Sequence, residues 1–418
     1  MTSVADPSLP RGHIREAVTA APAATARDIR LDFFRGLAMF IILIAHTPRN
    51  FFTSWIPARW GFSDATEIFV FCSGMASAIA FGKAFEQRGW LMGTARVSFR
   101  VWQVYWAHIG LFFAVATLLA AIDHFGDFDK VYIGSLNLWK FFADPGPQLI
   151  GLFTLTYVPN YFDILPMYLV ILAMMPLMMA LARINLWAMF VAMAVIWVFA
   201  QRSVLDALGL MHLHLGFPAE PWSDRKWFFN PFGWQLVFFT GFALMRGWIP
   251  RPPVNAALIG IALALVIANI PLSHIGMREI FAPLSPDMRE AVIDWRIANQ
   301  GLINKSDFGI LRYVHFLSLA YLCWAAAGEG GARLRAVGVG VASRVWGVLL
   351  AMILKVGQQS LAVFVFSMFF ARLSGFVMDQ VGRTTWNMVL ANLVGFAALI
   401  VVAFVVSWFK GHPWRAAR

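Results

Sequence analysis

The first long apolar run of the chain is RLDFFRGLAMFIILIAH, residues 30–46. It carries two functional candidates on an otherwise hydrophobic segment, Arg35 near its start and His46 at its end. Apolar runs of about 18 to 25 residues, the length that spans a bilayer, recur along the chain. The 418-residue sequence is 60% hydrophobic and only 13% charged, which is too apolar for one soluble core. The sequence therefore predicts a membrane protein built from α-helices.

Hydropathy along the chain predicts about ten transmembrane helices. They are expected at residues 33–51, 65–85, 97–122, 161–182, 184–200, 231–248, 254–272, 309–327, 358–378 and 386–409. We predict an all-α, polytopic bundle that forms a single transmembrane domain over residues 29–412. A disordered cytoplasmic tail, residues 1–28, is expected before it, and a short cytoplasmic tail, residues 413–418, after it.

The distribution of charge indicates how the bundle is oriented. The net charge is +11, and basic residues exceed acidic ones mainly in the segments that are cytoplasmic if the amino terminus is inside. This agrees with the positive-inside rule, so both termini are predicted to be cytoplasmic, and no nucleic-acid partner is needed to explain the charge. The two cysteines, Cys72 and Cys323, fall within apolar segments, so we expect neither a disulfide nor a metal site.

Ionisable side chains within apolar segments are functional candidates, because each costs about 2.5 to 3.5 kcal/mol to insert into a bilayer. Arg35 and His46 are eleven residues apart, which places them on one face of a helix and about 16 Å apart along its axis. We expect Arg35 to meet an anion that enters from the cytoplasm, and His46 to meet a hydroxyl from outside. The structural alternative is that Arg35 pairs with Asp32 at the interface and that His46 extends outward to water.

The second apolar segment begins with two acidic residues, Asp64 and Glu67, which follow Ser63. Ser63 is predicted to cap this helix, and the two carboxylates would then lie favourably in its first turn. A hairpin between the first two helices would also bring one of them to His46. Because a carboxylate can orient a histidine that acts as a general base, we predict a catalytic pairing of His46 with Asp64 or, less favoured, Glu67.

The third apolar segment contributes Arg96, Arg100 and His108. Arg96 and Arg100 are four residues apart on a helix, so they could hold phosphates or simply anchor the helix at the cytoplasmic interface. His108 lies about two turns further along; it could belong to the catalytic cavity or form a hydrogen bond between helices. Asp163, at the start of the fourth segment, could point into the same outward-facing cavity as His46 or cap its helix.

Three longer segments are expected on the outer side, at residues 123–160, 201–230 and 273–308. Each mixes aromatic, acidic and proline residues, a composition that suits a vestibule facing a sugar. The aromatic side chains available for stacking on a sugar are Tyr132, Trp222, Trp227 and Trp295. The alternative is that these residues anchor the protein at the membrane interface.

Several of these motifs resemble the OpgC family of osmoregulated periplasmic glucan succinyltransferases, which is related to the acyltransferase-3 group of membrane enzymes. The resemblance rests first on RLDFFRG at residues 30–36, followed by His46, and on GFSDATEIFVFCSG at residues 61–74. It continues in RVWQVYWAH at 100–108, DILPMY at 163–168, GQQSLAVF at 357–364 and WFKGHPW at 408–414.

The resemblance implies an O-acyltransferase in the bacterial inner membrane that moves a succinyl group from cytoplasmic acyl-CoA to hydroxyl groups of a periplasmic glucan. No bound cofactor is expected; succinyl-CoA would be a co-substrate, and glucan-synthesis proteins would be further partners. The resemblance also implies that Arg35 contacts the donor and that His46 is essential. The acyltransferase-3 group commonly has an Arg-x-x-Arg motif, and the spacing of Arg96 and Arg100 departs from it.

These expectations combine into one mechanism. Arg96 and Arg100 would hold the donor phosphates, the thioester would lie near Arg35, and His46 would deprotonate a glucose hydroxyl. Transfer could be direct or pass through an acyl-enzyme. The alternative function is a carrier or flippase for an anionic or glycan substrate, which would move its substrate without consuming a thioester.

Overall fold

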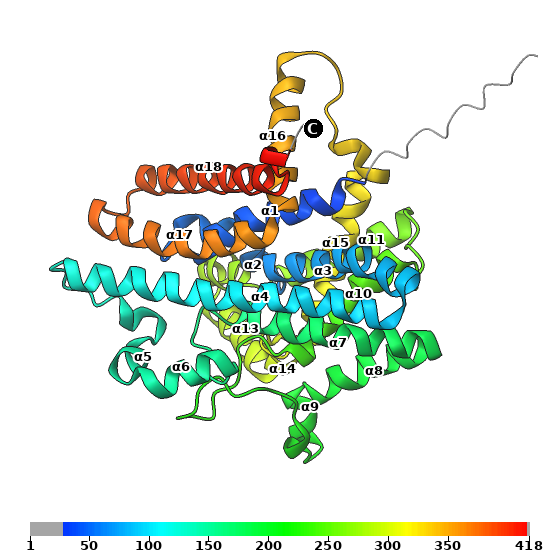
Figure 1. Ribbon diagram of the computed structural model, residues 1–418, viewed down its shortest axis with the longest axis horizontal. Helices are drawn as coiled ribbons and strands as arrows, with labels where there is room; N and C mark the ends of the chain where they lie inside the picture. Colours follow the sequence, from blue (N-terminus) through cyan, green and yellow to red (C-terminus); the bar gives the residue numbers. More distant parts are fainter. Residues whose placement is uncertain (1–27, 416–418) are drawn as a thin grey trace, which may run out of the picture.

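The computed structural model describes residues 28–415, and nearly all regular structure in this part of the chain is helical (Figure 1). The longer helices are α1 (Arg30–His46), α3 (Ala65–Ser77), α4 (Lys83–Phe125), α7 (Ile164–Ile184), α8 (Leu186–Phe199), α10 (Pro231–Arg246), α11 (Ala256–Asn269), α13 (Pro286–Ala298), α15 (Ile310–Ala327), α16 (Val341–Gln358), α17 (Ser360–Val381) and α18 (Thr385–Lys410). The connections contain the short helices α2 (Pro57–Trp60), α5 (Trp139–Ala143), α6 (Pro145–Thr154), α9 (Arg202–Ala207), α12 (Ala282–Leu284) and α14 (Gln300–Ile303). Within the described residues, extended backbone pairs only in one isolated bridge, between Pro218 and Lys226.

Six helical segments in residues 28–415 are long and apolar enough to cross a membrane. They are Ala65–Phe125, Ile164–Ile184, Ile310–Ala327, Val341–Gln358, Ser360–Val381 and Thr385–Arg415. The helices α8 and α11 are apolar but shorter. These segments mark the chain as a membrane protein and confirm the predicted all-α class; the count of ten spans and the cytoplasmic position of the termini stay predictions.

Local backbone chemistry sets where the first helices end. The helix α1 stops at His46, short of the predicted residue 51, because Thr47 is extended (φ −72°, ψ 114°) and precedes Pro48, which disfavours helical backbone before it. One helical path, kinked at Gly89, covers the spans predicted at 65–85 and 97–122. The kink has a positive φ of 79°, a conformation that strains any residue with a Cβ atom.

The helix α16 was not predicted as a separate element. It ends at Gln358, and α17 begins at Ser360 after a bend at Gln359 (φ −104°, ψ 27°). Figure 1 shows α16 standing across the direction of α17 and α18. It packs closely on α1, since a Cβ atom added to Gly357 would lie 1.9 Å from the carbonyl oxygen of Asp32. Hydropathy does mark Val341–Gln358 as long and apolar enough to span a membrane, so α16 could have been predicted from the sequence.

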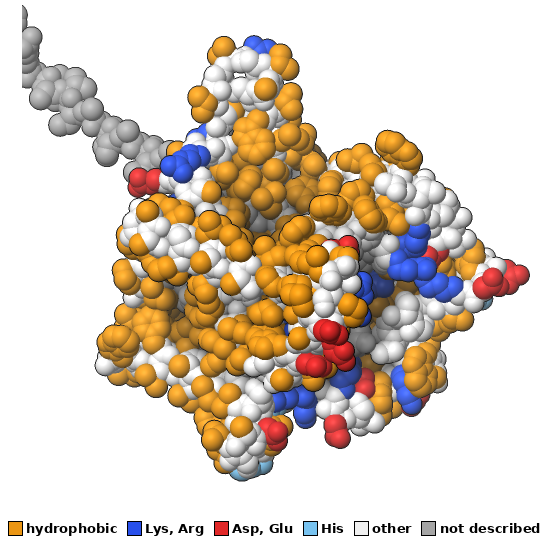
Figure 2. Space-filling model, turned by 180° about the vertical axis from the view of Figure 1, so that it is seen from behind, with side chains coloured by type: hydrophobic (Ala, Val, Ile, Leu, Met, Phe, Trp, Pro, Cys, Tyr) orange, Lys and Arg blue, Asp and Glu red, His pale blue; other side chains and the backbone are white. Residues whose placement is uncertain are grey.

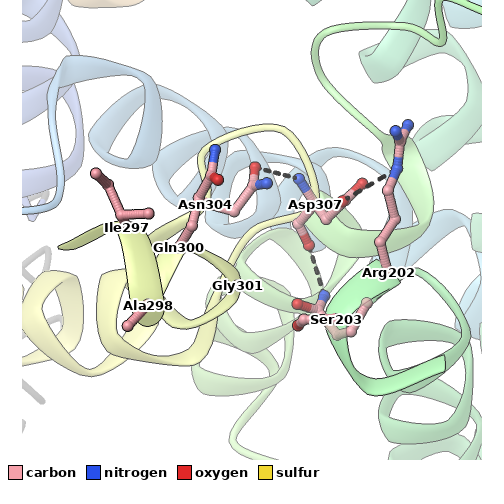
Figure 3. A pocket seen from close by; sticks show the side chains of 9 residues that line it. Arg202, Ser203, Ile297, Ala298, Gln300, Gly301, Asn304 and Asp307 are labelled. Atoms are coloured by element: carbon pink, nitrogen blue, oxygen red, sulfur yellow. Dashed lines mark hydrogen bonds and ion pairs between the residues drawn. The ribbon is translucent and has the colours of Figure 1, made fainter. Parts of the chain in front are cut away.

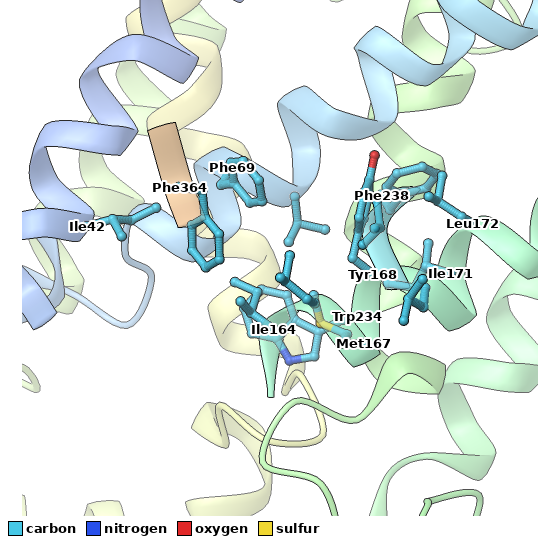
Figure 4. Packing of buried hydrophobic residues seen from close by; sticks show 14 of the residues in the cluster. Ile42, Phe69, Ile164, Met167, Tyr168, Ile171, Leu172, Trp234, Phe238 and Phe364 are labelled. Carbon is cyan, nitrogen blue, oxygen red and sulfur yellow. The ribbon is translucent and has the colours of Figure 1, made fainter. Parts of the chain in front are cut away.

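The core of the bundle joins helices that are distant in sequence. Helix α1 packs against α3, α16 and α17, α3 packs against α10, and α4 packs against α7. Phe69 of α3 stacks on Phe364 of α17, with ring centroids 5.8 Å apart and an interplanar angle of 18°. Figure 4 shows this pair beside Ile42 of α1. The packing therefore brings α1, α3 and α17 together where the candidate site lies.

Much of the outer surface is hydrophobic. Figure 2 shows one face on which apolar side chains dominate and the charged side chains gather mainly toward one edge. Large apolar side chains such as Trp187 and Trp386 are 75% and 81% exposed. In a membrane protein such surface is covered by lipid, so the polar groups inside the bundle are the ones that need an explanation.

Candidate functional site

His46 lies in the last turn of α1 with its imidazole held in one orientation. Its Nδ1 atom is 2.8 Å from the carbonyl oxygen of Ile42. A carbonyl can only accept a hydrogen bond, so Nδ1 carries the proton and Nε2 keeps a free lone pair. Within residues 28–415 no hydrogen bond engages Nε2, and the side chain is only partly buried. The imidazole is therefore set up to accept a proton through Nε2.

Tyr161 and Arg372 complete the immediate surroundings of His46. The ring of Tyr161 packs edge-on against the imidazole, with centroids 5.4 Å apart, and its hydroxyl donates to the carbonyl of Met368 at 2.5 Å. The guanidinium carbon of Arg372 lies 3.9 Å from the centre of the Tyr161 ring. Arg372, Lys305 and Asp64 all lie within electrostatic range of the imidazole. A histidine, a tyrosine and a cation thus meet between α1 and α17.

Asp64 caps helix α3, and Ser63 does not, which corrects the predicted capping residue. The Asp64 side chain accepts from the backbone N–H of Thr66 at 2.7 Å, and the Asp64 N–H donates to Oε2 of Glu67 at 2.8 Å. These two bonds form a capping box. The hydroxyl of Ser63 instead lies 2.8 Å from Nδ1 of His315.

Both carboxylates are engaged by cations that are distant in sequence. The ammonium of Lys305 pairs with Asp64, and Arg312 lies 3.7 Å from the same carboxylate. Arg312 also donates to Oε1 of Glu67 through Nε at 2.9 Å and Nη2 at 2.5 Å. Burial opposes ionisation, but Lys305 and Arg312 outweigh it and hold the pKa of Asp64 well below its usual range.

The predicted pairing of His46 with an acid has no direct hydrogen bond among the described residues. Asp64 is near enough to act on the imidazole electrostatically, but its oxygens are used by Lys305, Arg312 and the helix cap. Glu67 is fully buried against Arg312. The structure thus places Asp64 in the site of His46 without a shared bond, and the catalytic roles of both acids stay predictions.

Arg35 and His46 lie on one continuous helix, α1, near its start and at its end. The guanidinium of Arg35 donates to the hydroxyl of Ser360, the first residue of α17, while Arg372, near His46, lies further along α17. The Nε atom of Arg35 is buried without a hydrogen-bond partner within residues 28–415. Asp32, one turn earlier on α1, accepts from the amide of Gln358 at 3.3 Å. The first half of α1 therefore holds a cation with one hydrogen-bond donor that has no partner among the described residues.

The structure does not join the candidates of α4 to His46. Arg96 is exposed, and Arg100 donates to Gln103 of its own helix at 3.1 Å. His108 is fully buried, and neither of its ring nitrogens has a hydrogen-bond partner in the described part of the chain. The two arginines remain available for an anion, whereas nothing in these contacts places His108 in the site.

Asp163 ties a loop to the start of α7. It is buried, and its carboxylate accepts from the backbone N–H of Phe228 at 2.9 Å. Although it occupies the capping position of α7, its side chain makes no capping bond. Burial raises the pKa of Asp163 to about 6, despite the opposing effects of the Phe228 N–H and Arg225. Asp163 therefore stabilises the loop beside the site, two residues from Tyr161.

Four polar residues of this region were not predicted from the sequence: Lys305, Arg312, His315 and Arg372. Arg312 and His315 lie inside the predicted span 309–327, and Arg372 lies inside the predicted span 358–378. The criterion that singled out Arg35 and His46, an ionisable group within an apolar segment, would have found these three as well. Lys305 carries no such signal, because it lies in a polar connection and reaches Asp64 only in the folded bundle.

Fold and site together define a helical membrane protein whose interior holds a positioned histidine and several cations. The family described as OpgC protein matches residues 27–411. The chain belongs to the OpgC family, which confirms the family that its motifs resemble. No curated protein and no solved structure matches the chain.

Proposed function

We propose that this chain is a membrane O-acyltransferase that moves a succinyl group from cytoplasmic acyl-CoA to a hydroxyl group of a periplasmic glucan, in the bacterial inner membrane. Membership of the OpgC family implies a transferase that modifies glucans. The observation that carries the proposal is the orientation of His46, whose Nδ1 is fixed by Ile42 and whose Nε2 is left for a substrate hydroxyl. Carriers also use intramembrane histidines as proton relays, so consumption of the thioester is what separates the two functions.

The reaction uses the lone pair on Nε2 of His46. Nε2 takes the proton of a glucose hydroxyl as the hydroxyl oxygen attacks the thioester carbonyl, so the ester C–O bond forms. The C–S bond then breaks, and the departing thiolate receives the proton from the imidazolium. The negative charge that develops on the carbonyl oxygen needs cationic or N–H donors, and Arg372 is a cation beside the imidazole.

The donor would approach from the Arg35 end of α1. Arginine suits this role, because its guanidinium binds phosphate and carboxylate groups through two parallel hydrogen bonds. Arg35 keeps a buried Nε without a partner in the described residues, and Arg96 is exposed. In the proposed orientation of the acyl-CoA donor, Arg96 and Arg100 hold its phosphate groups, while Arg35 directs its acyl chain toward His46.

The test is acyl transfer by the purified full-length protein in lipid vesicles, with succinyl-CoA and a glucose oligosaccharide. Release of free thiol and the mass of the sugar product are both measured. His46→Ala should abolish product formation, and His46→Gln should do the same, because an amide cannot take the proton. The matched control is His124→Ala, since His124 is exposed at the end of α4 and contacts Phe125.

Wild-type protein that moves the sugar across the vesicle membrane without releasing thiol would support a carrier instead. Normal sugar acylation by His46→Ala would overturn the assignment of the base. Equal loss in His124→Ala would mean that the assay reports folding and not the chemistry of His46.

A further inference from the structure

Two adjoining cavities lie beside the His46 site, and the mechanism above does not use them. Their volumes are about 440 and 300 Å³, and both are lined by Arg202, Asn304 and Asp307. Figure 3 shows the larger one, between the short helix α9 and the end of α13 with α14. Each volume falls in the range of small-molecule binding sites. Because they share these three residues, the two cavities adjoin each other.

The lining offers many planar polar groups but little net charge. Arg202 pairs with Asp307 at 3.5 Å, and Arg225 pairs with Glu220 at 3.1 Å. The remaining charges of the lining are one of each sign, Asp224 and Lys226. Such a surface attracts neither an anion nor a cation strongly, so a neutral ligand with many hydroxyl groups suits it best.

Several of these groups are free to bind a ligand. The side chains of Gln300 and Lys226 form no hydrogen bond to any described residue and line the two cavities, one each. Trp227 lines the second cavity and is 4% exposed, yet its indole N–H has no partner within residues 28–415. A buried donor without a partner costs about 1 to 3 kcal/mol.

Two chain segments connect the cavities directly to the catalytic histidine. Asn160 lines the second cavity, and the next residue, Tyr161, packs against the imidazole of His46. Asn304 and Ser306 also line the cavity, and Lys305 between them pairs with Asp64. Consecutive Cα atoms are about 3.8 Å apart, so each segment places one side chain in the cavity and the next at the His46 site.

We infer that the joined cavities bind the acceptor glucan and present one of its hydroxyl groups to His46. This inference rests on the proposed function, because the acyl acceptor must lie within reach of Nε2. The Arg202–Asp307 pair and the amides of Asn160, Asn304 and Gln300 would bind neighbouring sugar hydroxyls, which accept and donate in turn. The ligand class is a neutral oligosaccharide of several glucose units.

The experiment measures sugar binding to the purified full-length protein in detergent without any acyl donor. A linear and a cyclic glucose hexasaccharide are titrated by calorimetry. Gln300→Trp fills the larger cavity from an exposed position, and Arg202→Gln removes the cation while Asn230 still donates to Asp307 at 3.2 Å. Arg289→Trp is the control, since Arg289 is exposed on α13 and lines neither cavity.

Wild-type protein and Arg289→Trp should bind one of the hexasaccharides equally, and the other two variants should bind it at least tenfold more weakly. Acyl transfer by those two variants should show a raised KM for the sugar and an unchanged KM for succinyl-CoA. No binding by the wild type, or equal binding by all four proteins, overturns the inference. Sugar binding by the wild type without any acyl transfer would support the acceptor pocket and overturn the proposed reaction. Acyl transfer with an unchanged sugar KM in both variants would support the reaction and overturn the acceptor pocket.

Discussion

Arg312 of α15 donates two hydrogen bonds to the same carboxylate oxygen of Glu67 in α3, at 2.9 and 2.5 Å. The two residues are separated by 245 positions in the chain, and both side chains are buried, Glu67 completely. The other oxygen of Glu67 closes the capping box with Asp64. One side chain thus neutralises a buried cation and completes the start of the helix next to the His46 site.

Substitution of Arg312 should destabilise the protein more than substitution of Glu67. Arg312→Met leaves the carboxylate of Glu67 buried without its cation, and we expect a loss of about 3 to 5 kcal/mol in the free energy of unfolding. Glu67→Gln should cost less, because Asp64 remains 3.7 Å from Arg312. Denaturant titration in detergent micelles measures both. The double variant should lose less than the sum of the single losses; strictly additive losses would mean that the pair is not coupled.

Arg372 should contribute charge to the transition state. It lies over Tyr161 beside His46, and no ion pair with an acidic residue engages it within residues 28–415. Arg372→Met should lower kcat/KM about 100-fold, as loss of a group that stabilises an oxyanion does. Arg372→Lys should recover part of the activity because the charge is kept. Arg344→Met, at an exposed position of α16, is the control; unchanged kcat/KM in Arg372→Met would exclude this role.

Arg35 should act on the donor and not on the acceptor. Arg35→Gln should raise the KM for succinyl-CoA by about 30-fold or more, the worth of a charge-assisted hydrogen bond. Ser360→Ala removes only the hydroxyl that receives the bond from Arg35 and leaves the guanidinium in place, so we expect a smaller rise of about fivefold. Steady-state kinetics with each substrate varied in turn distinguishes the two KM values. A rise in the sugar KM alone would contradict the assignment.

Asp163 should make the stability of the protein depend on pH. Its pKa is about 6 in the folded protein, raised by burial from 3.8, so the folded state favours the protonated acid. This contribution is complete below about pH 4 and is lost as the pH rises through 6. Asp163→Asn has no proton to lose, so its advantage over the wild type should grow between pH 4 and 7, to about 3 kcal/mol at most. Thermal unfolding at pH 4 and pH 7 measures this difference. An equal difference in melting temperature between the two proteins at both pH values would contradict the expectation.

Much of the fold was predictable because hydropathy is a property of consecutive residues and can be read directly from the sequence. The predicted helices at 161–182, 309–327 and 386–409 correspond to α7, α15 and α18. The face shared by Arg35 and His46 was predictable too, because helical periodicity alone relates residues on one helix. The end of α1 was misplaced because Pro48 lies inside the apolar run, where the backbone preference before proline outweighs hydropathy.

By itself, then, the sequence determined the helical membrane class, the family, and the position of a cation and an imidazole along α1. Only the tertiary structure decided which groups surround that imidazole. These groups come from three distant segments, as Tyr161, Lys305 and Arg372. Arg312 pairs with Glu67, one of the two acids predicted as partners of His46. The physical reason is that hydrophobic pattern and helix geometry act locally, whereas the partner of a buried charge depends on which distant segments pack beside it.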